Sequence, residues 1–207
     1  MQEIPPSSGA SHGYNSRSDF LDQLGIYFLR DIDDVQAERF SKTMLVIASI
    51  FKREPGRRIT VYINSGGGSV GAGFAMIETI FRIKREYGVP VDTVILGYAY
   101  SMGAIISQAG DNRSMGFFST MMLHSSSWTI LGDDQKIFSD YQKLSKLYQS
   151  RIGELFHRRT KMHSVSWWTR FIYSGRDRFL SSAECLDLKL VDEVCAFDTC
   201  YIVDESV

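Results

Sequence analysis

The feature that most constrains this fold is a run of three glycines between an apolar strand and a helix. The segment 59–63 (ITVYI) is β-branched and apolar, which favours a buried strand. The loop 64–69 (NSGGGS) follows, and the apolar residues after it recur at spacings of four, three and four, from Val70 to Phe81, as on one helix face. Consecutive glycines allow positive φ and close approach of another backbone. The sequence therefore predicts a tight strand-to-helix connection that a second segment can approach.

The same alternation continues along the chain and predicts an α/β domain. Further strands are expected at 25–29, 93–97 and 119–123, with closing strands within 191–203. Further helices are expected at about 33–51, at 101–109, along the apolar stripe 137–155 and within 176–190. Residues 1–20 are rich in Ser, Gly and Pro and predict a mobile tail, so that the folded domain spans 21–207.

The composition and net charge limit the size of the core and the kinds of molecule that the chain is expected to bind. The chain has 207 residues, of which 44% are hydrophobic, enough for one domain with a buried core. Lys and Arg total 23 against 24 Asp and Glu, so the net charge of -1 predicts neither nucleic acid nor a membrane as partner. No apolar stretch approaches the ~20 residues of a membrane span. The start, MQEIPPSSGASHGYNSRSD, has no basic segment followed by an apolar run, which predicts no signal peptide.

The cysteines predict a reducing compartment. The three of them, Cys185, Cys195 and Cys200, are an odd number clustered late in the chain. This pattern argues against a disulfide scaffold and against a zinc site. We therefore expect a cytoplasmic location and no metal.

Three interpretations of the glycine loop stay open on its residues alone. Gly66, Gly68 and Gly71 match the dinucleotide fingerprint G-x-G-x-x-G, and Asp92 lies 21 residues after Gly71. Asp92 precedes its expected strand, however, whereas a ribose contact needs a carboxylate at the strand's end. The second interpretation is an oxyanion hole made from a glycine N–H. The third is a tight turn without chemistry.

Three further residues have the chemical types of a catalytic triad. Ser101 lies between a predicted strand and an apolar helix, where its hydroxyl and the N–H of Met102 can point to one place; a helix N-cap is the alternative. His124 ends an apolar strand, either as a general base or as an ordinary buried histidine. Asp177 either orients an imidazole or pairs with a neighbouring arginine. Spacing alone leaves each pair of alternatives open.

Four blocks together resemble the family of Clp protease proteolytic subunits, ClpP. They are INSGGGSVGAG (63–73), YSMGA (100–104), MMLH (121–124) and RDRFLSSAECLDLKLVDEV (176–194), in the family's order and approximate spacing. The resemblance covers about residues 25–195. It implies a crotonase-like α/β fold, a superhelix of repeating ββα units, with a projecting helical handle at about 125–165.

The resemblance also implies an activity and the residues that perform it. By the family motif, Ser101 is the nucleophile, His124 the general base and Asp177 the residue that orients the base. The implied oxyanion hole and substrate contacts are, respectively, Gly68 and Met102, and Gly67, Ser69, Val70 and Ser125. The implied activity is a serine endopeptidase that cleaves unfolded proteins and short peptides inside an oligomeric chamber, without metal or nucleotide cofactor. The implied partners are further copies of the chain, as two stacked heptameric rings, and an AAA+ unfoldase that uses ATP.

Several features depart from the family pattern. Gly66 stands where relatives usually have proline, Tyr100 replaces a small residue and could crowd the pocket, and SSSW after the MMLH block replaces the usual Gln-Pro. These departures keep a catalytically silent subunit of a mixed ring as an alternative. A third candidate is a crotonase-type acyl-CoA enzyme, which uses loop carboxylates and no serine nucleophile. The set of Ser101, His124 and Asp177 argues against it.

Overall fold

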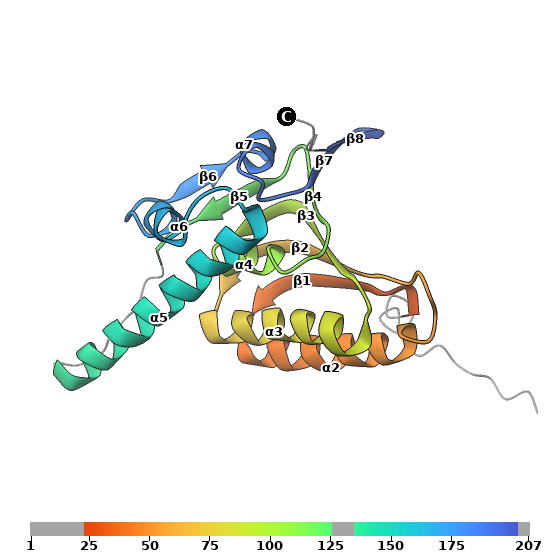
Figure 1. The fold of residues 1–207 in the computed structure, drawn as a ribbon, viewed down its shortest axis with the longest axis horizontal. Helices are drawn as coiled ribbons and strands as arrows, with labels where there is room; N and C mark the ends of the chain where they lie inside the picture. The colour runs from red at the N-terminus through yellow and green to blue at the C-terminus, as the bar shows by residue number, and fades with distance from the viewer. Residues whose placement is uncertain (1–22, 126–134, 203–207) are drawn as a thin grey trace, which may run out of the picture.

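The computed structural model describes residues 23–125 and 135–202, and within them eight strands form one sheet (Figure 1). The hydrogen-bonded path runs β1-β2-β3-β4-β7-β8, with β5 joined to β3 and β6 to β5. The strands are β1 (Ile26–Ile32), β2 (Ile59–Gly68), β3 (Val91–Tyr100), β4 (Arg113–Gly116), β5 (Thr120–Leu123), β6 (Arg178–Leu180), β7 (Glu193–Ala196) and β8 (Thr199–Ile202). The helices are α2 (Asp34–Phe51), α3 (Val70–Tyr87), α4 (Met102–Ser107), α5 (Gln135–Thr160), α6 (Val165–Ile172) and α7 (Ser182–Asp187). Only β5–β6 and β7–β8 pair antiparallel among these strands.

Helices α2 and α3 lie side by side against one face of β1, β2 and β3 (Figure 1). Both confirm the predictions from apolar spacing. The expected stripe of α2 is buried at Phe40, Met44, Ile47 and Phe51. Asp33 begins this helix because its carboxylate accepts the Gln36 N–H at 2.7 Å, which satisfies one of the free donors of the first turn.

The glycine segment is part of a strand, so the predicted loop over 64–68 is wrong. After a register shift, β2 continues to Gly68 and pairs with β1, where Asp31 lies opposite Gly67. A neighbouring strand supplies hydrogen-bond partners that the local sequence does not reveal. For the same reason β3 begins earlier than expected. Asp92, expected before its strand, lies inside β3.

The helix predicted within 176–190 is confirmed as α7, but the residues at the start of that range are not helical. Residues 178–180 instead form β6, which pairs with β5. Only α7 is helical, and Ser181 begins it with a capping box in which Ser181 and Glu184 bond reciprocally. Strands this short carry little periodicity, so β4 and β6 become visible only through their pairing.

Helix α5 projects from the domain, as Figure 1 shows. Its C-terminal part is anchored by Ile152 and Phe156, which are buried, and the Phe156 ring lies 5.2 Å from that of Trp168 in α6. Gly153 permits this close crossing, because a Cβ there would collide with the Thr169 hydroxyl. No helix in the described part of the chain is long and apolar enough to cross a bilayer.

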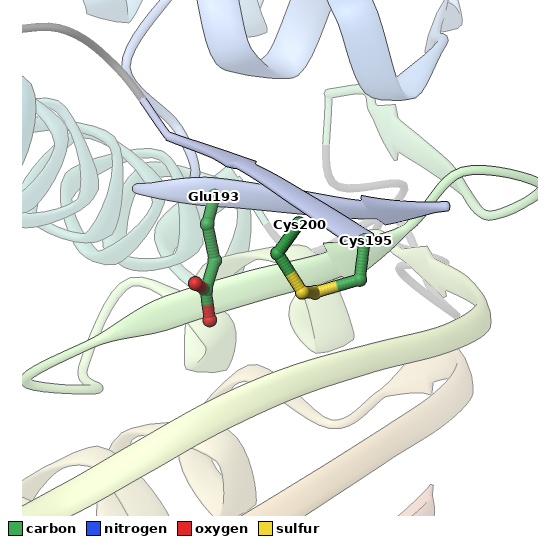
Figure 2. A group of neighbouring side chains, drawn as sticks. All are labelled: Glu193, Cys195 and Cys200. Carbon is green, nitrogen blue, oxygen red and sulfur yellow. A yellow bond between two sulfur atoms is a disulfide. The ribbon is translucent and has the colours of Figure 1, made fainter. Parts of the chain in front are cut away.

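The cysteines differ from expectation. Cys195 on β7 and Cys200 on β8 form a disulfide across the antiparallel pair, with their Cα atoms 3.9 Å apart (Figure 2). Cys185 is the buried free thiol. Two cysteines separated by five positions meet only if a hairpin turns between them, which spacing in sequence does not establish. The cysteine pattern therefore no longer argues for a reducing compartment.

An ion pair joins the start of β4 to the start of β7. Arg113 is 4% exposed and donates two side-chain hydrogen bonds to Asp192, at 3.0 and 2.5 Å. The Arg113 N–H donates a third at 2.8 Å. Burial alone would raise the pKa of Asp192, but these bonds and the arginine charge hold it below its usual range. The carboxylate therefore stabilises the folded chain in its charged form.

Replacing Asp192 by Asn tests this link. We expect a loss of about 1–3 kcal/mol of unfolding free energy near neutral pH, because a buried guanidinium loses a charged acceptor. The loss should shrink as the pH falls below about 4 and through the lowered pKa of Asp192, since wild type then loses the same charge. Denaturant titration at neutral and acidic pH measures both effects. Asp187→Asn, at an exposed position, is the control and should change stability by less than about 0.5 kcal/mol; equal loss in both variants would contradict the role of Asp192.

Candidate active site

Ser101 lies at the turn between β3 and α4 in a backbone conformation that non-glycine residues seldom adopt. Its φ is 51° and its ψ is -120°, a placement that costs about 1–3 kcal/mol and is common at functional sites. Its N–H donates to the Met122 carbonyl at 2.8 Å, which ties the turn to β5. Although Ser101 occupies the N-cap position of α4, its side chain makes no capping hydrogen bond. The helix-cap interpretation of this serine is therefore wrong.

The hydroxyl of Ser101 instead contacts His124. Its Oγ lies 2.8 Å from His124 Nε2. The two residues meet because β5 runs parallel to β3, with Tyr100 opposite Met122, so the residues beyond these strand positions converge. In the tautomer with its proton on Nδ1, the half-buried imidazole accepts a hydrogen bond from the serine hydroxyl. This is the geometry of a nucleophile and its general base.

Asp177 approaches the other side of the imidazole. Strand β6 is antiparallel to β5, with Arg178 opposite Leu123, so the residue before β6 lies beside His124. Asp177 Oδ1 is 3.8 Å from His124 Nδ1, beyond hydrogen-bond length, and the Asp177 side chain is 61% exposed. Arg178, a rival partner, donates to the Phe171 carbonyl at 2.6 Å. The fold thus brings the aspartate to the histidine without closing the bond between them.

Gly67 lets the end of β2 lie directly against the serine turn. Its φ is 100°, and a Cβ there would lie 2.8 Å from Ser101 Cβ and 3.0 Å from the Tyr100 carbonyl oxygen. The Met102 nitrogen is 3.3 Å from the same point. As the first residue of α4, Met102 has an N–H that no carbonyl of its own helix can accept. The Met102 N–H group and the Ser101 Cβ therefore both lie beside the end of β2.

Gly68 is crowded from its other side. A Cβ at Gly68 would collide with the Ile32 carbonyl, so β1 closes on the strand there. Ser65, which sequence reasoning did not single out, is fully buried, and its Oγ accepts the Gly67 N–H at 3.2 Å. The signal that could have found it is its place directly before the glycines. Ser65 therefore helps to fix the glycine conformation.

The remaining expected substrate contacts, Ser69, Val70 and Ser125, follow the glycine run or His124 in the chain. Ser69 caps α3, because its Oγ accepts the Ala72 N–H at 3.3 Å. Val70 begins α3 and is partly buried against the core. Ser125 follows His124 and is half-buried. The rest of the SSSW motif lies outside the described residues.

Tyr100 is held by its neighbours on β5 and β6. Its hydroxyl lies 2.9 Å from Thr120 Oγ1, and its ring is 4.9 Å from that of Tyr98 and 5.7 Å from that of Phe179. The side chain expected to crowd the site is therefore part of an aromatic group that spans β3 and β6.

The dinucleotide interpretation of the glycines is wrong. Asp92 lies opposite Thr60, near the start of β2, whereas the glycines end that strand. Its carboxylate accepts two hydrogen bonds from Arg58, at 2.6 and 2.5 Å. A ribose contact would need the opposite end of the sheet. Within the described residues, the side chains spaced to hold a metal lie on β7 and β8, not beside Ser101.

The comparisons with known proteins all indicate the same family. The sequence pattern of the Clp protease family matches residues 8–198. The chain is 30% identical over 176 residues to the ATP-dependent Clp protease proteolytic subunit of Chlorella vulgaris, covering 84% of this chain and 82% of that protein. It is 30% identical over 193 residues to subunit 1 of Streptomyces coelicolor, covering 92% and 83%. It is 31% identical over 174 residues to subunit 3 of Rhodococcus jostii, covering 83% and 81%.

The glycine run offers a matched pair of variants. Gly67→Ala should lower the rate at which a fluorophosphonate labels Ser101 by about tenfold or more, because the methyl group displaces the serine turn. Gly66→Ala is the control, since no atom lies within 4 Å of a Cβ there and its φ is not positive. Labelling followed by mass spectrometry, with thermal melts of both variants, measures the effect. Equal labelling rates would contradict the packing role of Gly67.

Proposed function

Since the chain belongs to the Clp protease family, we propose that it is a serine endopeptidase with Ser101 as its nucleophile. The observation that carries the proposal is the 2.8 Å contact between Ser101 Oγ and His124 Nε2, made by a serine in a strained turn. A serine with only a structural role requires neither the contact with His124 nor the strained backbone. Activity of this kind requires no metal or nucleotide on this chain.

The proposed reaction has two steps. Ser101 Oγ attacks the peptide carbonyl while His124 Nε2 takes its proton, and the C–N bond then breaks as the same nitrogen protonates the leaving amine. Water next attacks the acyl-enzyme, again with His124 as base, and releases the acid and the free serine. The negative oxygen of each tetrahedral intermediate is assigned to the N–H groups of Gly68 and Met102. The close approach of the glycine run to the start of α4 supports that assignment.

The proposed binding segment for the substrate strand runs from Gly67 to Val70. The backbone at Gly67, Ser69 and Val70 would pair with an extended peptide by β-augmentation, and Ser125, which follows His124 in the chain, is the further proposed substrate contact. The proposed substrates are unfolded proteins and short peptides, because an extended strand is the conformation such pairing selects.

The proposed assembly is two stacked heptameric rings that enclose the active sites, on a crotonase-like superhelix of ββα units with α5 as part of the handle. Support comes from α5, which projects from the domain and leaves apolar side chains exposed, with Tyr141 at 42% and Leu147 at 47%. Surface of this kind is typical of a contact between subunits. The relatives' names call them ATP-dependent, which supports an AAA+ unfoldase as the partner that delivers substrate.

One observation favours a second candidate. The 3.8 Å separation of Asp177 from His124, with Asp177 largely exposed, describes a triad that is not closed in the single chain. A silent subunit of a mixed ring would keep such a triad open permanently, whereas an active enzyme would close it on assembly.

Ser101→Ala tests the proposal. We expect wild type to hydrolyse short fluorogenic peptides and to be labelled at Ser101 by a fluorophosphonate. The variant should lose both, with kcat at least about 1,000-fold lower, because the nucleophile is gone. Ser49→Ala, an exposed serine on α2, is the control and should retain full activity. Oligomer mass is recorded on each sample. An assembled wild-type ring without labelling would contradict the peptidase assignment and favour the silent subunit.

Asp177→Asn separates the two states of the triad. In dissociated subunits we expect the labelling rate to fall by less than about tenfold, because the aspartate is not bonded to the base. In the assembled oligomer the fall should reach about 100-fold or more, as expected where a closed bond holds the tautomer. Labelling rates measured on size-separated fractions decide this. Equal effects in both fractions would mean that assembly does not close the triad.

A further inference from the structure

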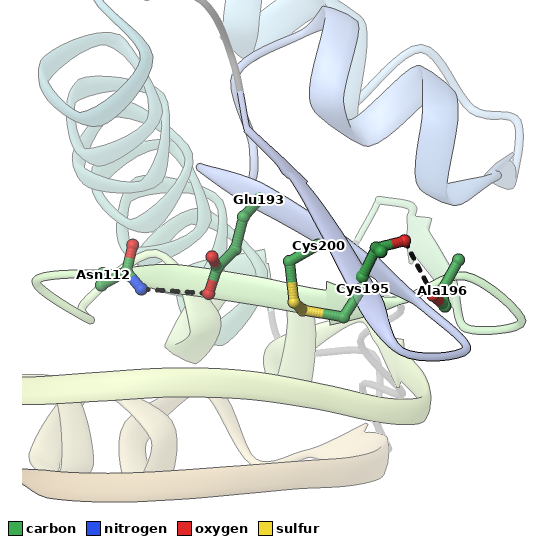
Figure 3. The surroundings of a disulfide bond; sticks show 6 residues. Asn112, Glu193, Cys195, Ala196 and Cys200 are labelled. Atoms are coloured by element: carbon green, nitrogen blue, oxygen red, sulfur yellow. Dashed lines mark hydrogen bonds between the residues drawn. A yellow bond between two sulfur atoms is a disulfide. The ribbon is translucent and has the colours of Figure 1, made fainter.

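The β7–β8 hairpin places three soft or anionic groups on one face at the edge of the sheet. Glu193 and Cys195 are two residues apart on β7, so their side chains point to the same face. Cys200 lies directly opposite Cys195. Figures 2 and 3 show the three side chains gathered on one side of the ribbon. This convergence is independent of Ser101 and its neighbours.

The pairing geometry explains why the two cysteines are so close. The Cys195 carbonyl accepts the Phe117 N–H at 2.8 Å, from the loop after β4. It is therefore turned away from β8, as in a non-hydrogen-bonded pair, where opposed side chains come closest. Strand β8 pairs only with β7 among the described strands, and Cys200 is exposed. Cys200, at this edge of the sheet, is therefore the half of the disulfide that a small reductant would approach.

The spacing of the three groups suits a metal ion once the disulfide is reduced. The two sulfurs and a Glu193 oxygen all lie within 4.8 Å of one another. Around tetrahedral zinc, thiolate and carboxylate ligands lie about 3.6–3.8 Å apart, given bonds of about 2.1–2.3 Å. On reduction the two sulfurs, now bonded to each other, must separate to that spacing, and the Glu193 oxygen already lies within 4.8 Å of both. Three protein ligands leave a fourth position for water.

A neighbouring residue already orients the carboxylate. Asn112, from the loop before β4, donates from Nδ2 to Glu193 Oε1 at 3.3 Å, as Figure 3 shows. Such a bond leaves the other carboxylate oxygen for a metal, as outer partners do in metal sites. The third cysteine takes no part, because Cys185 is buried and burial raises its pKa to about 12. The reactive thiols of the reduced chain are therefore those of the hairpin.

We propose that Glu193, Cys195 and Cys200 form a redox-gated site for one thiophilic divalent cation of the zinc class. A dithiol reductant transfers two electrons and two protons to the Cys195–Cys200 bond and itself becomes a disulfide. The cation then displaces the two thiol protons and binds two thiolates and the carboxylate. In the reverse step a small-molecule disulfide takes up two electrons and two protons and becomes a dithiol, while the Cys195–Cys200 bond re-forms and the cation loses both sulfur ligands. The hairpin is thus cross-linked covalently in one state and by the metal in the other.

The test uses Zn²⁺ alone and the full chain, in disulfide and reduced forms. Thiol counting under denaturing conditions identifies each form, and the reductant is removed without air before titration. We expect the reduced chain to bind one Zn²⁺ and the disulfide form to bind none at the same concentrations. Co²⁺ in place of Zn²⁺ should give a thiolate charge-transfer band in the reduced form alone.

Variants identify the ligands. Cys200→Ser should weaken Zn²⁺ binding by about 100-fold or more, and Glu193→Gln by about tenfold or more, since losing a direct ligand costs at least as much as losing an outer partner. Asp198→Asn is the matched control, because it removes a nearby exposed carboxylate from the hairpin turn and should leave affinity unchanged. Thermal melts show whether each variant is folded.

Three results would overturn the proposal. These are a reduced wild-type chain that binds no Zn²⁺, equal binding by the disulfide and reduced forms, and full binding by the Cys200→Ser variant. If that variant is unfolded, the comparison of the two wild-type forms and the Glu193→Gln titration still decide the question.

Discussion

The backbone contact between Gly67 and the serine turn is the constraint on which the site depends. The end of β2 lies so close to Ser101 that a single methyl group on Gly67 would overlap the serine Cβ. The contact holds Ser101 from one side, while its N–H bond to the Met122 carbonyl holds it from the other. A positive φ at a serine is unfavourable in isolation. It persists here because two strands and a helix start determine it together.

Ser101, His124 and Asp177, the proposed nucleophile, base and orienting residue, lie at the ends of three strands that are neighbours only in space. Parallel pairing of β3 with β5 and antiparallel pairing of β5 with β6 converge on His124. The same pairings place Tyr100, Met122 and Phe179 in one line across the sheet. The outermost of the three catalytic candidates, Asp177, precedes the short strand β6 and is the most exposed. The weakest geometry of the set therefore lies where the sheet gives least support.

At the β7–β8 edge of the sheet, strand pairing also brings reactive side chains together, here the sulfurs of two cysteines. Antiparallel register brings Cys195 against Cys200 and aligns Glu193 with them. The reactivity of a thiol depends on its exposure. Cys185 shows the contrast, because it is buried, its pKa is raised and the thiol stays protonated. The two hairpin cysteines and the buried one differ in environment, not in residue type.

The sequence by itself determined the α/β class, the helices α2 and α3 and the identity of the residues that converge on the site. Apolar spacing is a local property, and it survives in long helices because burial of one face dominates their stability. Helix α2 and its Asp33 cap follow this rule. The motif blocks likewise contain Ser101, His124 and Asp177, so these candidates follow from the sequence alone.

Only the tertiary structure decided which alternatives held. In the folded chain the glycine segment is the end of a strand, Asp92 accepts a hydrogen bond from Arg58, and Cys195 and Cys200 form a disulfide. The tertiary structure also separated Ser101 from a helix-capping role by directing its hydroxyl to His124. Each of these outcomes depends on the register between paired strands, most of them distant in sequence, with the cysteine hairpin as the local exception. The register is fixed by which strand faces are buried and by which carbonyls accept hydrogen bonds from which N–H groups. The local sequence specifies neither of these.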